Sequence, residues 1–284
     1  MKNMNARYIP FAIGLLVGIG LFLIFRWWGF LVLFPWLGAS ISFGIYLRQA
    51  LPKDRKELGR RVSILLNLPA LLLFVPFVNN ENFQLEGVVL IVLAGYFSKG
   101  FIHFAISKIF GPLIWGRGFC GWACWTAAVL DWLPMKKQRI FPQKLGNMRY
   151  LILVASVSLP FYLVFVAGYD VRGSYIGKAE LGWMMGSNIV YYLLAIPLAY
   201  ILKDRRAFCK ALCPVSLVMK VPARFARIRM KPSGNTCIEC GICNHSCMMG
   251  VDVMSAISQG LRVKNTECVL CGTCKIKCPV QAIQ

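Results

Sequence analysis

The sequence contains few charged residues for its length. Asp, Glu, Lys and Arg make up 15% of the 284 residues, whereas hydrophobic residues make up 58%. The mean hydropathy is +0.61, and a soluble globular domain has a smaller apolar share than this. The composition therefore excludes a soluble protein for most of the chain. It favours a membrane protein with several spans and a small soluble part.

Acidic residues and histidines are especially scarce. Only 11 Asp and Glu stand against 32 Lys and Arg, which gives a formal net charge of +21. Such a charge would suit nucleic acid, but the basic residues gather at the ends of apolar runs, where they orient spans in a membrane. We therefore expect no nucleic-acid partner. His103 is the only histidine in an apolar run, which argues against a haem held by two membrane histidines.

Six apolar runs are long enough to suggest membrane-spanning helices. They cover approximately residues 8–25, 30–47, 62–78, 87–107, 150–166 and 183–202. The first shows no convincing small-residue cleavage site, so we expect an uncleaved span. Loop 48–61 holds six basic residues in fourteen, which predicts that this loop and both termini are cytoplasmic. We predict an all-α polytopic bundle of about six transmembrane helices, multi-pass in a bacterial-type inner (cytoplasmic) membrane.

Cysteines are concentrated near the C-terminal end of the chain. Eight of the 12 cysteines form two copies of the spacing C-x2-C-x2-C-x3-C, at Cys237, Cys240, Cys243 and Cys247, and at Cys268, Cys271, Cys274 and Cys278. Bacterial ferredoxins with two cubane clusters use this spacing, because iron prefers soft thiolate ligands. A zinc ribbon would use C-x2-C pairs, and a disulfide framework needs an oxidising compartment. The spacing therefore predicts two [4Fe-4S] clusters.

The last cysteine of each copy is expected to serve the other cluster, as in two-cluster ferredoxins. We predict that cluster 1 is held by Cys237, Cys240, Cys243 and Cys278. We predict that cluster 2 is held by Cys268, Cys271, Cys274 and Cys247. Gly241 and Gly272 follow the second cysteine of each copy, and the missing β-carbon lets backbone N–H groups approach the cluster sulfurs. Residues 232–284 are expected to form a small α+β ferredoxin-type domain.

The other four cysteines form two C-x3-C pairs, Cys120 with Cys124 and Cys209 with Cys213. Each pair follows an inward-going predicted span, the fourth or the sixth, so both are expected at the cytoplasmic face. At positions i and i+4 of a helix, both thiols of a pair would point the same way. The pairs could hold a third cluster or another soft metal, or act as redox thiols. They could also be buried packing residues. The repeated spacing favours a metal or redox function.

These motifs resemble a known family. With C-x3-C-P at Cys209–Pro214, its partner pair at Cys120–Cys124 and the doubled tail motif, the chain resembles the NapH/MauN-type membrane-bound 4Fe-4S ferredoxin family, which includes quinol dehydrogenase ferredoxin subunits. The resemblance covers about residues 87–284, although the first pair is followed by Trp125 where the family usually has proline. It implies an electron-transfer subunit of an oxidoreductase system. The implied partners are quinone or quinol, as an exchangeable substrate, and other iron–sulfur or cytochrome electron-transfer subunits.

The resemblance also suggests how the chain is divided. Residues 1–80 would be additional N-terminal spans, residues 81–231 a family-like transmembrane core, and residues 232–284 the ferredoxin-type domain. Lys99 and His103 lie one helical turn apart in the fourth apolar run, and ionisable residues inside a membrane are candidate functional groups. They are a possible quinone or proton site. The alternative is that Lys99 extends to the membrane interface.

Two other functions remain open at this point. One is a membrane metal-reducing assembly factor, CcoG-like, that would use the C-x3-C pairs. The other is a cluster-based redox sensor, in which the clusters detect a redox state instead of transferring electrons to a partner.

Overall fold

The structure is a computed structural model, which describes residues 7–95, 98–135 and 142–284. The chain divides into two compact units, Met1–Val78 with Cys120–Trp132, and Asn79–Phe119 with Leu133–Gln284. Each unit is described by itself. The boundaries predicted at residues 80 and 231 stay a prediction.

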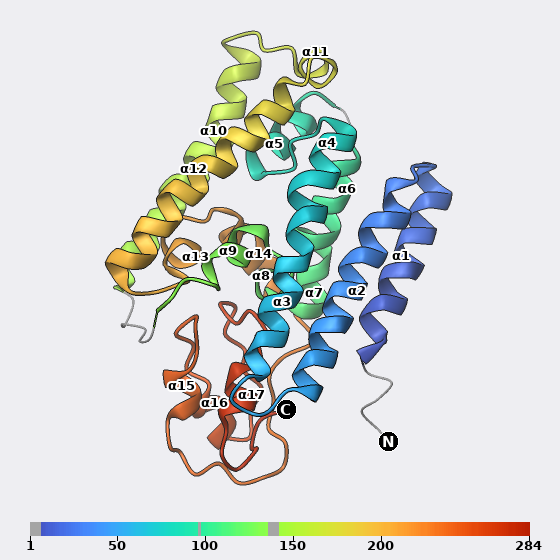
Figure 1. The fold of residues 1–284 in the computed structure, drawn as a ribbon. Helices are drawn as coiled ribbons and strands as arrows, with labels where there is room; N and C mark the ends of the chain where they lie inside the picture. The colour runs from blue at the N-terminus through green and yellow to red at the C-terminus, as the bar shows by residue number, and fades with distance from the viewer. Residues whose placement is uncertain (1–6, 96–97, 136–141) are drawn as a thin grey trace. The chain divides into compact units, whose positions relative to one another are not determined.

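The first unit is built from a helical hairpin and a third long helix. Helix α1 (Ile9–Phe25) and helix α2 (Gly29–Ala50) run side by side in opposite directions (Figure 1). Arg26, with a φ of 53°, ends α1 in the left-handed conformation. Helix α3 (Lys56–Pro69) continues through η2 (Ala70–Phe74) into α4 (Val75–Asn79). The short helices α8 (Gly118–Trp122) and α9 (Trp125–Leu130) follow in the chain after α7 of the second unit.

Small residues allow α1 and α2 to approach closely. A β-carbon on Gly14 would lie 2.4 Å from the carbonyl oxygen of Phe34, and one on Gly18 would lie 2.7 Å from the carbonyl oxygen of Phe30. The two glycines are four residues apart, which is the spacing of small residues at close helix contacts in membranes. Backbone packing at these positions therefore holds the hairpin together.

A buried ion pair attaches segment 120–132 to α3. The Arg60 guanidinium lies 2.6 Å from the Asp131 carboxylate, and their side chains are only 1% and 2% exposed. Arg60 also donates to the carbonyl of Gly121, and Asn67 donates to the carbonyl of Trp122. Removing one member of such a pair leaves an uncompensated buried charge, so this contact fixes the segment firmly.

The second unit contains the remaining helices. Leu85, Val88 and Phe104 form a buried apolar cluster, against which Val215 and Val218 pack. This cluster joins α5 to α6 and α14. The helices of this unit are α5 (Leu85–Leu93), α6 (Lys99–Phe104), η3 (Ala105–Phe110), α7 (Gly111–Trp115), η4 (Gln143–Asn147), α10 (Met148–Phe165), α11 (Val171–Ile176), α12 (Ala179–Leu202), α13 (Ala207–Ala211), α14 (Val215–Ala223), α15 (Ile242–His245), α16 (Met254–Ser258) and α17 (Thr273–Lys277).

The structure does not support six spans. In the described part of the chain, four helices are long and apolar enough to cross a membrane, namely Gly29–Ala50, Lys56–Asn79, Lys144–Phe165 and Ala179–Leu202. The run predicted as a fourth span, 87–107, is broken. Helix α5 ends at Leu93, Gly95 has a φ of +64°, and the Ser98 hydroxyl accepts from the backbone N–H of Phe101 to begin α6. Residues 96 and 97 of that run lie outside the described residues.

The tail also differs from its prediction. Residues 232–284 were predicted to be α+β, but the described residues form no strand, and Pro232 and Ile283 make one isolated bridge. The two ends of the tail are joined by backbone hydrogen bonds that Lys231 and Gln284 exchange and that Ser233 donates to Ala282. This pairing is too short to form a strand.

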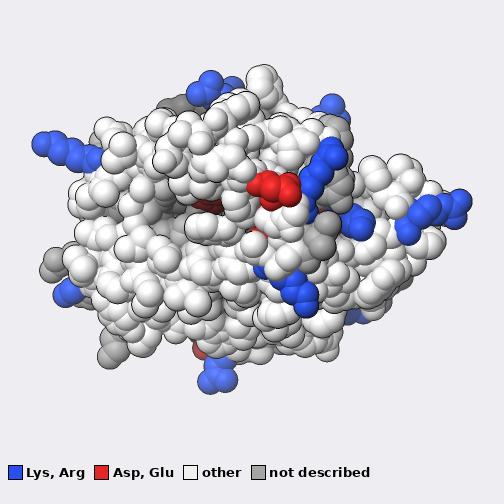
Figure 2. All heavy atoms as spheres, turned by 90° about the horizontal axis from the view of Figure 1, so that it is seen from above, with Lys and Arg blue, Asp and Glu red and all other residues white. Residues whose placement is uncertain are grey.

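Charged side chains are distributed unevenly. Figure 2 shows the end of the molecule that carries α11 in Figure 1, where basic side chains project outward and some acidic atoms lie recessed among uncharged atoms. Of the acidic residues in the second unit, Glu81 and Glu180 are 3% and 0% exposed. Buried carboxylates are costly unless they are hydrogen-bonded, and both have hydrogen-bond donors nearby.

The close contact of α1 with α2 can be tested with two matched glycines. We expect Gly18→Val to lower the free energy of unfolding by about 1–3 kcal/mol, because the new side chain overlaps the Phe30 carbonyl. Gly20→Val, in the same helix, has open space within 4 Å and should cost much less. Thermal unfolding in detergent measures both. Equal losses in the two variants would show that the close approach is not what stabilises the hairpin.

Candidate functional site

The two cysteine motifs of the tail have the same backbone conformation. Equivalent residues of the motifs lie 31 positions apart, as Cys237 and Cys268 do. Glu239 and Leu270 both have a φ of 51°, although non-glycine residues rarely adopt positive values. Gly241 and Gly272 both have a φ of 71°. Each motif therefore forms the same tight loop, in which left-handed residues bring the first three cysteines round one centre.

The fourth cysteine of each motif accepts a backbone hydrogen bond. The N–H of Val251 donates to Sγ of Cys247 at 3.3 Å, and the N–H of Ala282 donates to Sγ of Cys278 at 3.2 Å. Hydrogen bonds to cluster sulfurs are one of the factors that set reduction potentials. The local structure is thus suited to sulfur atoms that carry negative charge.

The first quartet of thiols comes from both motifs. One small apolar cavity is lined by Cys237, Cys240, Cys243 and Cys278. Its other walls are mainly aliphatic, and Met254 and Ile257 of α16 contribute to them. The structure therefore brings together the four cysteines that the sequence predicts for cluster 1. Their assignment as ligands stays a prediction.

The thiols of the second quartet lie close enough together to shift one another's pKa values. The pKa of the Cys268 thiol is raised to about 11, mainly by burial and then by Cys271 and Cys247, whereas Arg117 opposes the shift. Burial also raises the pKa of Cys274, and Cys271, Cys268 and Cys247 add to that effect. Cys247, from the first motif, therefore lies among the three cysteines of the second. Deprotonating four neighbouring thiols is costly, and a metal group that supplies positive charge would offset that cost.

The C-x3-C pairs do not have the predicted helical geometry. Cys120 lies in α8, which ends at Trp122, and Cys124 has the extended conformation of an N-cap before α9. Likewise, Cys209 lies in α13, which ends at Ala211 before Cys213. A helix end therefore separates the two thiols of each pair, and the expectation that they share a helix face is wrong. The proline that follows the second pair takes the N-cap position of α14 instead.

The pairs also show no metal centre. Among the described residues, no three His, Cys, Asp or Glu side chains are grouped so as to hold a metal ion. Cys120 and Cys124 belong to the first unit, and Cys209 and Cys213 belong to the second. A third metal centre at these four cysteines is therefore not supported by the structure.

Lys99 and His103 lie in α6, as part of the broken fourth run. Glu81 accepts a hydrogen bond from the N–H of Gly100 and interacts electrostatically with Lys99. His103 is 2% exposed, and its ring lies 5.8 Å from the ring of Phe83, centroid to centroid. Both residues therefore have protein neighbours, and their role as a quinone or proton site stays a prediction.

A four-residue ion network was missed at the sequence level. The Glu267 carboxylate, directly before Cys268, binds Arg117, Arg149 at 3.1 Å and Lys220 at 2.9 Å. The three basic residues come from the α7–α8 turn, from α10 and from α14. Burial alone would raise the pKa of Glu267, but these cations lower it to about 2. The network attaches the second cysteine loop to the helices of its unit.

One signal could have pointed to Glu267. It is one of only 11 acidic residues in a chain with 32 basic ones, and it is adjacent to a predicted ligand. The partners of Glu267 could not be identified from the sequence, because Arg117 is 150 positions away in the chain. Long-range pairs of this kind are fixed by the tertiary fold.

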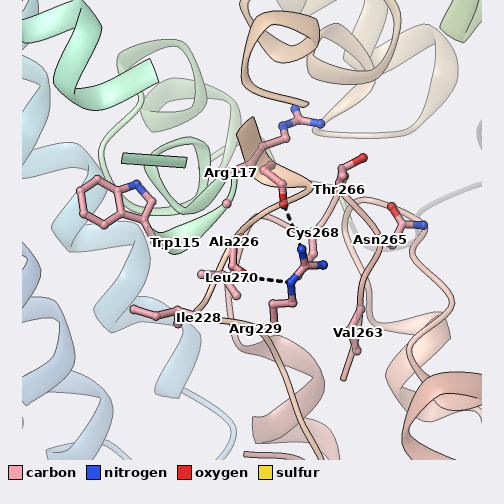
Figure 3. Close-up of a pocket in the computed structure, with 12 residues that line it drawn as sticks. Trp115, Arg117, Ala226, Ile228, Arg229, Val263, Asn265, Thr266, Cys268 and Leu270 are labelled. Carbon is pink, nitrogen blue, oxygen red and sulfur yellow. Dashed lines mark hydrogen bonds between the residues drawn. The ribbon is translucent and has the colours of Figure 1, made fainter. Parts of the chain in front are cut away.

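Two basic side chains, Arg117 and Lys210, lie near thiols of the second quartet. Figure 3 shows a small cavity in which Cys268 lies near Arg117 and Leu270, with Trp115 at the opposite wall. From α13, Lys210 lies close enough to Cys247 to oppose the rise of its pKa. Lys210 also contacts the Asp204 carboxylate at 2.6 Å. Positive charge near a cluster favours its reduced form.

Comparison with known proteins adds two domain matches. Residues 236–283 match a family described as a 4Fe-4S dicluster domain. Residues 100–146 and 189–232 match a family described as a 4Fe-4S binding domain. The second match includes all four cysteines of the C-x3-C pairs. No solved structure matches the chain.

Several curated proteins are similar to the chain. The uncharacterized protein MJ0750 of Methanocaldococcus jannaschii is 24% identical over 78% of this chain and 95% of its own length. Protein NirI of Paracoccus denitrificans is 30% identical over 60% of this chain. The methylamine utilization ferredoxin-type protein MauN of Methylorubrum extorquens is 25% identical over 50% of this chain. The chain spans about a quarter of NirI, 27%, and about half of MauN, 51%.

The Glu267 network can be tested by a neutral substitution. In Glu267→Gln the three cations lose their counter-charge, and we expect backbone amides of residues 266–272 to exchange hydrogen about tenfold faster or more. Hydrogen exchange followed by mass spectrometry measures this. The control is Glu239→Gln, an acidic residue in the loop of the first motif whose side chain is exposed. Unchanged exchange in the Glu267 variant would show that the network does not hold the loop.

Proposed function

Because the chain carries two 4Fe-4S ferredoxin-type domains and is related to the MauN ferredoxin-type proteins, we propose that it is a membrane-anchored electron-transfer protein. In this proposal it exchanges electrons between the quinone pool and a redox partner, either another iron–sulfur subunit or a cytochrome subunit. The observation that carries the proposal is the exchange of the fourth cysteine between the tail motifs. It places two thiol quartets in one small domain.

The thiols proposed as ligands are the two quartets described above. Cys237, Cys240, Cys243 and Cys278 would hold the first cluster, and Cys268, Cys271, Cys274 and Cys247 the second. When bound, such clusters accept and release single electrons and leave bond chemistry to other groups. The N–H groups of Val251 and Ala282 stabilise negative charge on the fourth sulfur of each motif. Glu267 keeps the second loop against α10 and α14.

The apolar helices supply the membrane attachment. Four helices suggest association with a membrane, which is where a lipid-soluble quinol would be met. We further propose the bacterial-type inner membrane, with both termini on the cytoplasmic side, because most basic residues would then be cytoplasmic. The C-x3-C pairs are proposed to assist electron passage between the membrane and the tail. Lys99 and His103 are kept as candidate proton-handling residues.

The cofactor content can be tested directly. We expect about eight irons and eight acid-labile sulfides per chain after anaerobic purification, from the ligand count of two cubanes. Cys247→Ser should damage the centre held by Cys268, Cys271 and Cys274. Electron paramagnetic resonance after stepwise reduction, with Cys278→Ser as the reciprocal variant, distinguishes the two centres. Tightly bound zinc without labile sulfide would contradict the assignment, and loss confined to the neighbouring centre in sequence would contradict the pairing.

The quinol connection requires a separate test. Cys213→Ser preserves size but removes a soft ligand, so the tail centres should still assemble. Their reduction by a quinol analogue should become slower, whereas dithionite should reduce them normally from solution. Stopped-flow absorbance measures both rates. A variant without all four C-x3-C cysteines that still reacts with quinol at the normal rate would remove the relay role and favour packing or metal handling.

A further inference from the structure

A carboxylate lies among the membrane helices of the second unit. Glu86 is in the first turn of α5. Its Oε1 accepts a hydrogen bond from the Ser156 hydroxyl at 2.6 Å and one from the Tyr191 hydroxyl at 3.4 Å. Glu86 is therefore held by α10 and α12.

The positions of Ser156 and Tyr191 along their helices indicate how deep in the membrane the Glu86 carboxylate lies. Ser156 and Tyr191 each lie near the middle of a helix that is long and apolar enough to cross a membrane, Lys144–Phe165 and Ala179–Leu202. The middle of a spanning helix lies in the hydrocarbon region. Glu86 thus presents an ionisable group at about mid-depth. Such residues are rare in membranes because they are costly, and they mark ligand or proton sites.

The hydrogen bonds of Glu86 are incomplete. Oε2 is buried and has no hydrogen-bond partner among the described residues, although a carboxylate has about four acceptor positions. The residue as a whole is half-buried, so part of the side chain is accessible, and reorientation of the carboxylate is needed for a ligand to reach Oε2. A buried acceptor without a donor is unfavourable, and a ligand hydroxyl would satisfy it.

Tyr191 connects this carboxylate to the second C-x3-C pair. Its ring lies 5.3 Å from the ring of Phe208, centroid to centroid, and it interacts electrostatically with both Glu86 and Cys213. A ligand at Glu86 would therefore lie close to the segment that leads into the cysteine-rich part of the chain. The aromatic wall suits a flat ring, and the two hydroxyls and the carboxylate suit its oxygen atoms.

We propose that Glu86, Ser156 and Tyr191 form a binding site for the headgroup of a quinone or quinol, with Glu86 as its proton-exchanging group. This inference rests on the proposed electron-transfer function. A quinol that becomes a quinone loses two protons and two electrons. Glu86 takes up one proton, as an O–H bond of the quinol breaks and an O–H bond forms on the carboxylate. The second O–H bond of the quinol breaks as its proton is released to water. The electrons go singly to one-electron acceptors, which in the proposed function are the iron–sulfur centres.

Binding of a quinol analogue tests the site without any turnover. The probe is 2-heptyl-4-hydroxyquinoline N-oxide, whose fluorescence is quenched on binding, added to the full-length protein in nanodiscs. We expect Glu86→Gln and Tyr191→Phe each to weaken binding about tenfold or more, because each removes a hydrogen bond in a dry site. The controls are Glu180→Gln, a buried carboxylate held by Tyr169 and Ser174, and Tyr200→Phe on α12. Neither control should change the affinity.

Infrared difference spectroscopy adds a second readout. Addition of a reduced short-chain quinol to the wild-type protein should produce a protonated carboxyl band, and that band should be missing in Glu86→Gln. Wild-type affinity in both Glu86→Gln and Tyr191→Phe would overturn the site while leaving the proposed function intact. Failure of the wild-type protein to bind the probe or react with quinol would overturn both. If Glu86→Gln does not fold, Tyr191→Phe and Ser156→Ala decide the outcome by the same measurements.

Discussion

The tail depends on one constraint, which is that neither cysteine motif can complete a quartet alone. Three cysteines of a motif share one tight loop, and the fourth lies with the other motif, as the cavity lined by Cys243 and Cys278 illustrates. This exchange forces the two loops to fold as one body, although the described tail has no strand and only single helical turns. Apolar side chains such as Val251, Val263 and Ile283 are buried in this body. If the quartets hold clusters as proposed, folding would also be coupled to cluster assembly.

The second constraint is how this body is held against the helices of its unit. Glu267 is adjacent to Cys268, so its ion pairs act on the loop at a predicted ligand position. Arg117 is fully buried, and a buried cation without its counter-charge is strongly unfavourable. These ion pairs therefore serve mainly to hold the second cysteine loop in position. They keep the loop of the second quartet close to the helices and place positive charge beside it.

The loops of the tail motifs could be predicted from the sequence because the first three cysteines of each motif are close together in the chain. Their role as cluster ligands stays a prediction. The broken fourth run was predicted as one span because hydropathy does not register a turn at Gly95 or a cap at Ser98. The contact of Glu86 with Ser156 was not predicted. The hydrogen bond to Ser156 joins residues 70 positions apart, and no local pattern contains it.

A continuous series of contacts runs from the middle of the membrane helices to the tail. Tyr191 interacts with Cys213, whose carbonyl accepts from the Ser216 hydroxyl at 2.7 Å. Arg149 donates to Ser216 and also binds Glu267. The hydrogen bonds in this series are 2.7–3.3 Å long, and all of these residues belong to the second unit. The second cysteine of the C-x3-C-P motif therefore has a structural role that does not require it to hold metal, because its backbone joins the membrane helices to the network beside Cys268.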